Sequence, residues 1–74
     1  MTDHERRTLR RAIERHKYLE IIDEVPATTS FAVLDRREQL CVCIADARML
    51  RDLVAMGAEW FLESVHNGGK LKRA

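Results

Sequence analysis

The sequence has few of the residues that cross-link or break a protein chain. Its 74 residues include two cysteines, one proline and three glycines, and its only aromatics are one tryptophan, one tyrosine and two phenylalanines. Cys41 and Cys43 stand two positions apart in a β-prone segment, where they share a face but do not readily reach disulfide geometry. We therefore expect no disulfide framework, and the scattered glycines leave no phosphate-cradling loop.

Long apolar runs and a charge imbalance are also absent. No segment approaches the roughly 20 apolar residues that span a bilayer, and the residues after Met1 lead into charge rather than into an apolar signal core. The net charge of +1 gives no overall attraction to nucleic acid or to an acidic membrane. We expect a cytoplasmic protein that does not bind membranes.

What the chain does have is a balanced mixture of apolar and charged residues. Hydrophobic residues make up 46% of it and charged residues 34%, which is the composition of a folded chain rather than a disordered one. Residues 1–74 suffice for a single domain with a thin core. Domains of this size often gain stability by oligomerising, so any uncovered apolar surface points to a partner.

The first segment has the pattern of an amphipathic helix. Thr2 and Glu5 have the spacing of a capping box. Apolar or weakly polar residues then recur at steps of three and four, as on one helix face: Leu9, Ala12, Ile13, His16, Leu19 and Ile22. Pro26 lacks an amide and disfavours helical geometry in the residue before it. The pattern predicts a helix over about residues 3–24.

Two short β-prone runs follow. Residues 31–35 read Phe-Ala-Val-Leu-Asp and residues 40–44 read Leu-Cys-Val-Cys-Ile, with a polar stretch that includes Arg36-Arg37-Glu38 between them. These runs predict a two-stranded β-hairpin over residues 31–44. An alternative stays open, because Asp35 or Glu38 is also suited to cap a helix over residues 35–45 and the turn lacks the glycine that tight hairpins favour.

The last third predicts a second helix. Asp46 is suited to its N-cap and Asn67-Gly68-Gly69 to its end, which gives a helix over about residues 47–66. Gly57 falls inside it, where glycine costs about 1 kcal/mol relative to alanine, so we expect a close backbone contact there. Residues 67–74 form a basic tail. The predicted fold is α+β, in the order α-β-β-α.

The predicted hairpin is apolar on both faces. Alternation places one set on the first face, namely Phe31, Val33, Leu40, Val42 and Ile44, and another set on the second, namely Ala32, Leu34, Cys41 and Cys43. A lone hairpin is marginally stable, so both faces need cover, either from one helix on each face or from another chain. Because the last helix has a broad apolar face, we predict a homodimer with an interface formed by Leu34, Cys41, Cys43 and Met49.

Two large side chains widen the apolar face of the predicted last helix. Met56 and Trp60 stand one turn apart there. Tryptophan is enriched at interface hot spots and methionine adapts to irregular surfaces. We predict that both residues anchor a protein partner, with a core position as the alternative for Trp60.

The predicted first helix carries a row of like charges. Arg7, Arg11 and Arg15 repeat at i, i+4 spacing, where they repel one another. Basic residues also gather toward its N-terminal end, the reverse of what the helix dipole prefers. We predict that this row binds an acidic protein partner. A solvated face and a nucleic-acid contact are the alternatives, the latter without any zinc-finger spacing or RNP-like motif to support it.

Candidate chemistry is sparse. Cys41 and Cys43, with His4, His16 or His66, offer thiolate and imidazole groups that suit zinc, but C-x-C with scattered histidines lacks the spacing of known sites. A nucleophilic site also needs a base, an orienting group and a concave pocket, for which so short a chain has little room. We predict no metal, no cofactor and no enzymatic activity.

The hairpin and the helix after it resemble a unit found in many short accessory proteins of bacteriophages. The residues that carry the resemblance are 31–35, 40–44 and Asp46 opening an apolar helix, so it covers about residues 31–66. This chain departs from the pattern by having Arg36-Arg37-Glu38 where the turn usually has glycine. The group includes anti-CRISPR proteins, so the resemblance implies a stoichiometric inhibitor of a host system. It carries over no binding residue.

These patterns together predict a non-catalytic protein-binding module that acts stoichiometrically on a macromolecular partner. The alternative is a small nucleic-acid-binding or regulatory protein that uses the arginines of the first helix.

Overall fold

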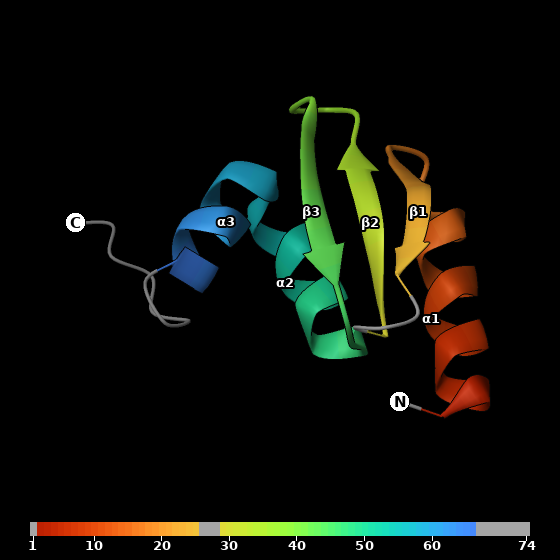
Figure 1. Ribbon diagram of the computed structural model, residues 1–74. Helices are drawn as coiled ribbons and strands as arrows, with labels where there is room; N and C mark the ends of the chain where they lie inside the picture. Colours follow the sequence, from red (N-terminus) through yellow and green to blue (C-terminus); the bar gives the residue numbers. More distant parts are fainter. Residues whose placement is uncertain (1, 26–28, 67–74) are drawn as a thin grey trace.

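The protein forms a three-stranded antiparallel sheet with its helices behind one face (Figure 1). The structure, a computed structural model, describes residues 2–25 and 29–66. The elements follow in the order α1 (Asp3–Arg15), β1 (Leu19–Val25), β2 (Ser30–Asp35), β3 (Leu40–Ile44), α2 (Ala47–Met56) and α3 (Ala58–His66). The predicted α+β class is confirmed, whereas the two-stranded sheet is wrong. The predicted basic tail lies outside the described residues.

The third strand is the larger departure from the sequence prediction. The helix expected to reach residue 24 ends at Arg15, with His16 as its C-cap, and β1 follows. The capping box of Thr2 and Glu5 forms as predicted. Residues 18–25 read Tyr-Leu-Glu-Ile-Ile-Asp-Glu-Val, in which β-branched and aromatic side chains favour a strand. Leu19 and Ile22 matched the helical spacing by coincidence.

The predicted hairpin is confirmed as β2 and β3. Leu34 pairs with Cys41 and Ala32 with Cys43, while β1 pairs with the other edge of β2 in the order β1-β2-β3. The turn closes without glycine because Gln39 adopts a positive φ of 58° and its amide donates to the Asp35 carbonyl at 2.7 Å. The alternative of a helix over residues 35–45 is therefore wrong.

The predicted last helix is two helices. Gly57 has a φ of +85° and forms the C-cap of α2, and α3 begins at the next residue. Glycine adopts this left-handed region without the steric cost that other residues meet. Gly57 thus lies at a break between two helices, and its close contact is with the Glu38 side chain rather than with a backbone crossing inside one helix. The predicted N-cap is confirmed, since the Asp46 carboxylate accepts from the Met49 amide at 2.8 Å.

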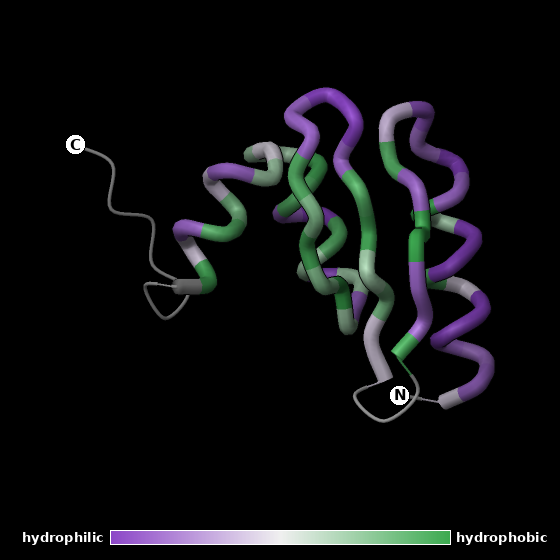
Figure 2. Tube along the Cα trace, turned by 45° about the horizontal axis from the view of Figure 1, so that its top comes forward, coloured by the Kyte–Doolittle hydropathy of each residue, from purple (hydrophilic) through white to green (hydrophobic). Residues whose placement is uncertain are grey.

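The core lies between the sheet and the helices, on one face of the sheet only. Its buried apolar residues come from every element: Leu9 and Ile13 of α1, Leu19 of β1, Phe31 and Val33 of β2, Val42 and Ile44 of β3, Leu50 and Leu53 of α2, and Ala58 and Phe61 of α3. Hydrophobic residues follow β2, β3 and α2, whereas α1 and the β2–β3 turn are mostly hydrophilic (Figure 2). One helix on each face of the hairpin, the simpler expectation, is therefore wrong.

Candidate interaction surface

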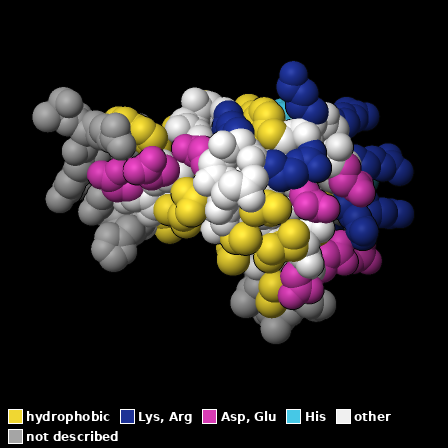
Figure 3. All heavy atoms as spheres, turned by 90° about the horizontal axis from the view of Figure 1, so that it is seen from above, with side chains coloured by type: hydrophobic (Ala, Val, Ile, Leu, Met, Phe, Trp, Pro, Cys, Tyr) yellow, Lys and Arg dark blue, Asp and Glu magenta, His cyan; other side chains and the backbone are white. Residues whose placement is uncertain are grey.

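The sheet face opposite the helices carries small and medium apolar side chains. Leu34 and Cys41 lie opposite one another on it, as do Ala32 and Cys43. Both cysteines are exposed and both β2 residues are half-buried. In Figure 3, which looks down on the molecule, apolar side chains gather along the side that faces the viewer in Figure 1.

Helix α3 extends this apolar surface past the edge of β3. Its Leu62 and Val65 are 39% and 52% exposed, which is high for large hydrophobic side chains. A groove of about 310 Å³ runs between β3 and α3, and both cysteines, Leu62, Val65 and Met49 line it. We call the six residues that share this surface the apolar strip: Ala32, Leu34, Cys41, Cys43, Leu62 and Val65.

The β2–β3 turn fixes the position of α3. The Glu38 carboxylate accepts hydrogen bonds from the first two amides of α3, those of Ala58 and Glu59, the latter at 3.3 Å. The turn thereby supplies the negative charge that a helix N-terminus prefers. A Cβ on Gly57 would come within 2.7 Å of the Glu38 Oε2 atom. The Glu38 carboxylate therefore packs closely against the backbone at Gly57.

Arg37, the residue before Glu38 in the β2–β3 turn, contacts the C-terminal end of α2. Arg37 donates to the Leu53 carbonyl at 2.8 Å and to the Asp35 carboxylate at 3.0 Å, and its guanidinium stacks 4.1 Å from the centre of the Tyr18 ring. Asp35 is fully buried. Burial lowers the pKa of Arg37, but the hydrogen bond and charge of Asp35 outweigh it and raise that pKa above its ordinary value. The sequence analysis considered this turn for its missing glycine and for a helix cap at Asp35 or Glu38, and it did not predict the contacts of Arg37.

Acidic side chains border the apolar strip on both sides. Glu20 and Asp23 stand on β1, and Glu59 and Glu63 on α3. The described strands and α3 contain no lysine or arginine. Figure 3 shows acidic side chains on either side of the gathered apolar ones. The surface therefore offers an apolar centre with a negative rim.

The predicted arginine row lies elsewhere, on α1. Arg7, Arg11 and Arg15 are all exposed, and within the described residues none of them forms an ion pair. Arg10, between them in sequence, pairs with Glu24 at 2.7 Å. Basic side chains gather at the α1 end of the molecule, away from α3 (Figure 3). The structure thus does not bring the arginines together with the predicted dimer residues.

The other predicted contact residues divide between the groove and the core. Met49 lines the groove, beside Cys41 and Cys43. Met56 and Trp60 do not share one helix, because the break at Gly57 separates them, and both are half-buried. Met56 packs against the core. Of the predicted sites, Leu34, Cys41, Cys43 and Met49 lie together, and the structure adds Leu62 and Val65 to them.

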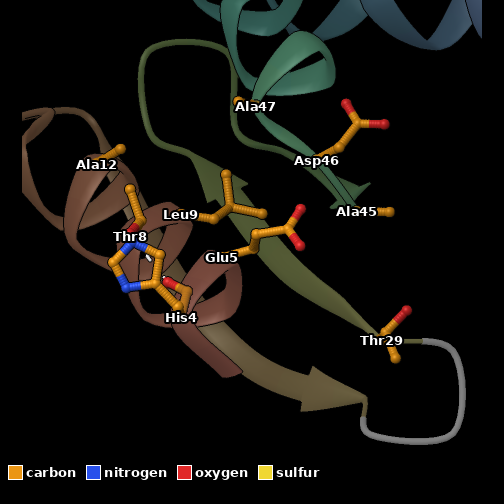
Figure 4. Close-up of a pocket in the computed structure, with 9 residues that line it drawn as sticks. All are labelled: His4, Glu5, Thr8, Leu9, Ala12, Thr29, Ala45, Asp46 and Ala47. Atoms are coloured by element: carbon orange, nitrogen blue, oxygen red, sulfur yellow. Dashed lines mark hydrogen bonds between the residues drawn. The ribbon is translucent and has the colours of Figure 1, made fainter. Parts of the chain in front are cut away.

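A second groove, of about 440 Å³, lies between the first half of α1 and the start of α2. Figure 4 shows Leu9 and Glu5 projecting from α1 toward it, with Asp46 on the opposite wall. Both carboxylates already cap helices, Glu5 at the Thr2 amide and Asp46 at the Met49 amide. These two carboxylates therefore stabilise the N-terminal ends of α1 and α2.

Two other kinds of site find no support in the described residues. Within residues 2–25 and 29–66, no three His, Cys, Asp or Glu side chains group as metal ligands would. None of the helices described there has the length and hydropathy needed to cross a membrane. Comparisons with protein-family models, curated proteins and solved structures give no match to this chain.

Proposed function

We propose that this protein is a non-catalytic binding module that acts stoichiometrically on another protein through the apolar strip. The observation that carries the proposal is the sheet face that none of the described helices covers, together with the exposed Leu62 and Val65 of α3. A contiguous apolar patch rimmed by polar residues is characteristic of protein interaction sites. Two capping contacts of the β2–β3 turn hold α2 and α3 in place, so the surface is preorganised for binding.

Self-association is one form of this proposal. Three of the four predicted dimer residues, Leu34, Cys41 and Cys43, belong to the apolar strip, and Met49 lies beside it. Light scattering after size exclusion at high micromolar concentration tests it. A dimer that dissociates in the variant with Cys43→Lys and Leu62→Lys supports self-association, and a strict monomer contradicts it.

Inhibition of a host system, such as CRISPR-Cas, is the biological role that we propose for such a binder. A rigid apolar patch on so small a chain suits a protein that acts by covering a surface of its target. The resemblance of residues 31–66 to phage accessory proteins supports the same role.

Affinity capture from a host lysate, with matched variants, tests the proposal. The test variant carries Cys43→Lys and Leu62→Lys, and the control carries Ala47→Lys and Ala55→Lys, which add the same charge at exposed positions of α2. We expect a protein that the wild type and the control capture and the test variant does not, and that forms a complex of fixed stoichiometry when purified. Capture that is equal for all three chains contradicts the proposal.

Binding of nucleic acid is the second candidate function. It is favoured by the exposed row of Arg7, Arg11 and Arg15, which lacks acidic partners among the described residues. Such binding weakens steeply with salt, because neutralised phosphates release counterions. Fluorescence anisotropy with duplex DNA and single-stranded RNA at two salt concentrations tests it. Absence of salt-sensitive binding, or binding unchanged when all three arginines are replaced by glutamine, removes this candidate.

A further inference from the structure

The outer edge of β3 offers backbone hydrogen-bonding groups to another strand. The amide of Arg36 donates to the carbonyl of Tyr18 at 2.8 Å, so alternate residues of β2, including Leu34, direct their backbone groups toward β1. Asp35, Val33 and Phe31 then face β3. By the same alternation, residues 40, 42 and 44 of β3 bond to β2, and Cys41 and Cys43 turn their amides and carbonyls outward. Within the described chain, these four groups have no hydrogen-bond partner.

The two edges of the sheet differ in how they are protected. The edge strand β1 carries Glu20, Asp23 and Glu24 and has an irregular register between Ile21 and Asp23. Charges and bulges of this kind prevent unwanted strand pairing. The edge strand β3 reads Leu-Cys-Val-Cys-Ile, with no charge, no proline and a regular register. Only the β3 edge therefore has the character of a strand acceptor.

The helix layer extends beyond β3, which leaves space for one more strand in front of it. Helix α3 lies to the outer side of β3 in Figure 1, and the groove of about 310 Å³ separates the two. Leu62 and Val65 face this groove while remaining 39% and 52% exposed. A strand paired with β3 would cover them from the front, as β3 covers part of α2.

We propose that β3 accepts an extended segment of the partner protein as a fourth strand, seated between β3 and α3. This inference rests on the proposed function and specifies how the partner binds. Side chains at alternate positions of the segment enter the groove toward Leu62 and Val65, so they are apolar. Glu59 and Glu63 stand on α3, the helix that borders the groove, and their negative charges favour basic residues at the flanks of the segment. A second copy of this chain fits less well, since its β3 carries no basic residue.

Binding of a synthetic peptide is the direct test. The probe is the acetylated and amidated peptide Lys-Val-Thr-Val-Thr-Val-Lys, and two comparison peptides replace lysine by glutamate or methylate the backbone nitrogens of alternate residues. NMR of the labelled protein follows the amides of Cys41 and Cys43 and the methyl groups of Leu62 and Val65. We expect shifts at all four residues and at least about tenfold slower exchange of the two amides at saturation. Neither comparison peptide is expected to reproduce this effect.

Proline variants separate strand addition from other binding at the same surface. Cys41→Pro or Cys43→Pro removes an outward amide and keeps the β2–β3 ladder, whereas Cys41→Ala and Cys43→Ala keep the amide. We expect each proline to weaken peptide binding about threefold to tenfold, and each alanine to leave it nearly unchanged. Thermal unfolding of every variant verifies the fold.

The outcomes also distinguish this inference from the proposed function. No peptide binding, shifts confined to α1, or equal binding by the proline and alanine variants overturns strand addition. If light scattering shows that the complex contains two copies of this chain, the assignment of the fourth strand to a separate partner is overturned. If a captured partner still depends on Cys43 and Leu62 side chains while the proline variants bind it normally, the proposed function stands and strand addition fails.

Discussion

The Glu38 carboxylate accepts a hydrogen bond from the amide of Ala58, the first residue of α3. Twenty residues separate the two positions in sequence, and the contact joins the β2–β3 turn to the helix that borders the apolar strip. Helix α3 is only nine residues long, too short to be stable by itself. Its position, and with it the groove against β3, therefore depends on this cap and on the packing of Ala58 and Phe61 in the core.

Replacing the capping carboxylate should loosen α3. We expect Glu38→Ala to lower the free energy of unfolding by about 0.5–2 kcal/mol, the usual cost of losing a helix N-cap. Urea unfolding measures the change. The matched control is Glu20→Ala, an exposed glutamate of β1 that should have little effect. Equal losses for the two variants would show that the Glu38 contact contributes nothing specific.

Alanine at position 57 should destabilise the folded protein for two separable reasons. The φ of +85° disfavours any residue with a Cβ, and that Cβ would lie 2.7 Å from the Glu38 Oε2 atom. We expect Gly57→Ala to destabilise the protein by at least about 1 kcal/mol. In the Glu38→Ala background the same change should cost less, because the steric conflict is gone. A double-mutant cycle with purely additive losses would contradict this coupling.

The contacts of Arg37 require the geometry of a guanidinium. Arg37→Lys keeps the charge but cannot serve the Asp35 carboxylate and the Leu53 carbonyl together, so we expect it to be less stable than wild type. Arg37→Met leaves the fully buried Asp35 without its charged partner and should cost about 3 kcal/mol or more. Urea unfolding measures both. Arg11→Met is the control and should change stability little, because Arg11 is exposed and forms no ion pair with any other described residue.

The capping box of α1 should give stability that depends on pH. Hydrogen bonds from the Thr2 backbone and side chain lower the pKa of Glu5 below its ordinary value of 4.5. The stability that the Glu5 carboxylate contributes is complete above the ordinary pKa and is lost as the pH falls through the lower pKa of the folded state. Urea unfolding between about pH 2.5 and 6 should therefore show a smaller loss on acidification for Glu5→Gln than for wild type. Parallel curves for the two proteins would refute the assignment.

The sequence predictions were most successful where local signals and the fold agree. The caps at Thr2 and Asp46 and the hairpin strands each have the residue types that their structures require. The end of α1 was missed because no glycine or proline marks it, and His16 ends the helix in extended geometry. The β-branched run after Tyr18 was the available signal for β1.

The break at Gly57 could not be derived from local pattern alone. Residues 47–66 keep a helical apolar spacing on both sides of the glycine, and the decisive contact comes from Glu38, far away in sequence. The apolar strip was predicted in part, since alternation placed Leu34, Cys41 and Cys43 on one face. Leu62 joins them only because the break redirects α3 alongside β3.

The central claim is that the apolar strip binds another protein chain, and chemical-shift mapping with the captured partner tests it most directly. The labelled protein is titrated with that partner, and perturbed backbone amides and methyl groups are assigned to residues. We predict that the largest changes cluster at Leu34, Cys41, Cys43, Leu62 and Val65. Changes clustered instead at Arg7, Arg11 and Arg15, with the apolar strip unaffected, would contradict the claim.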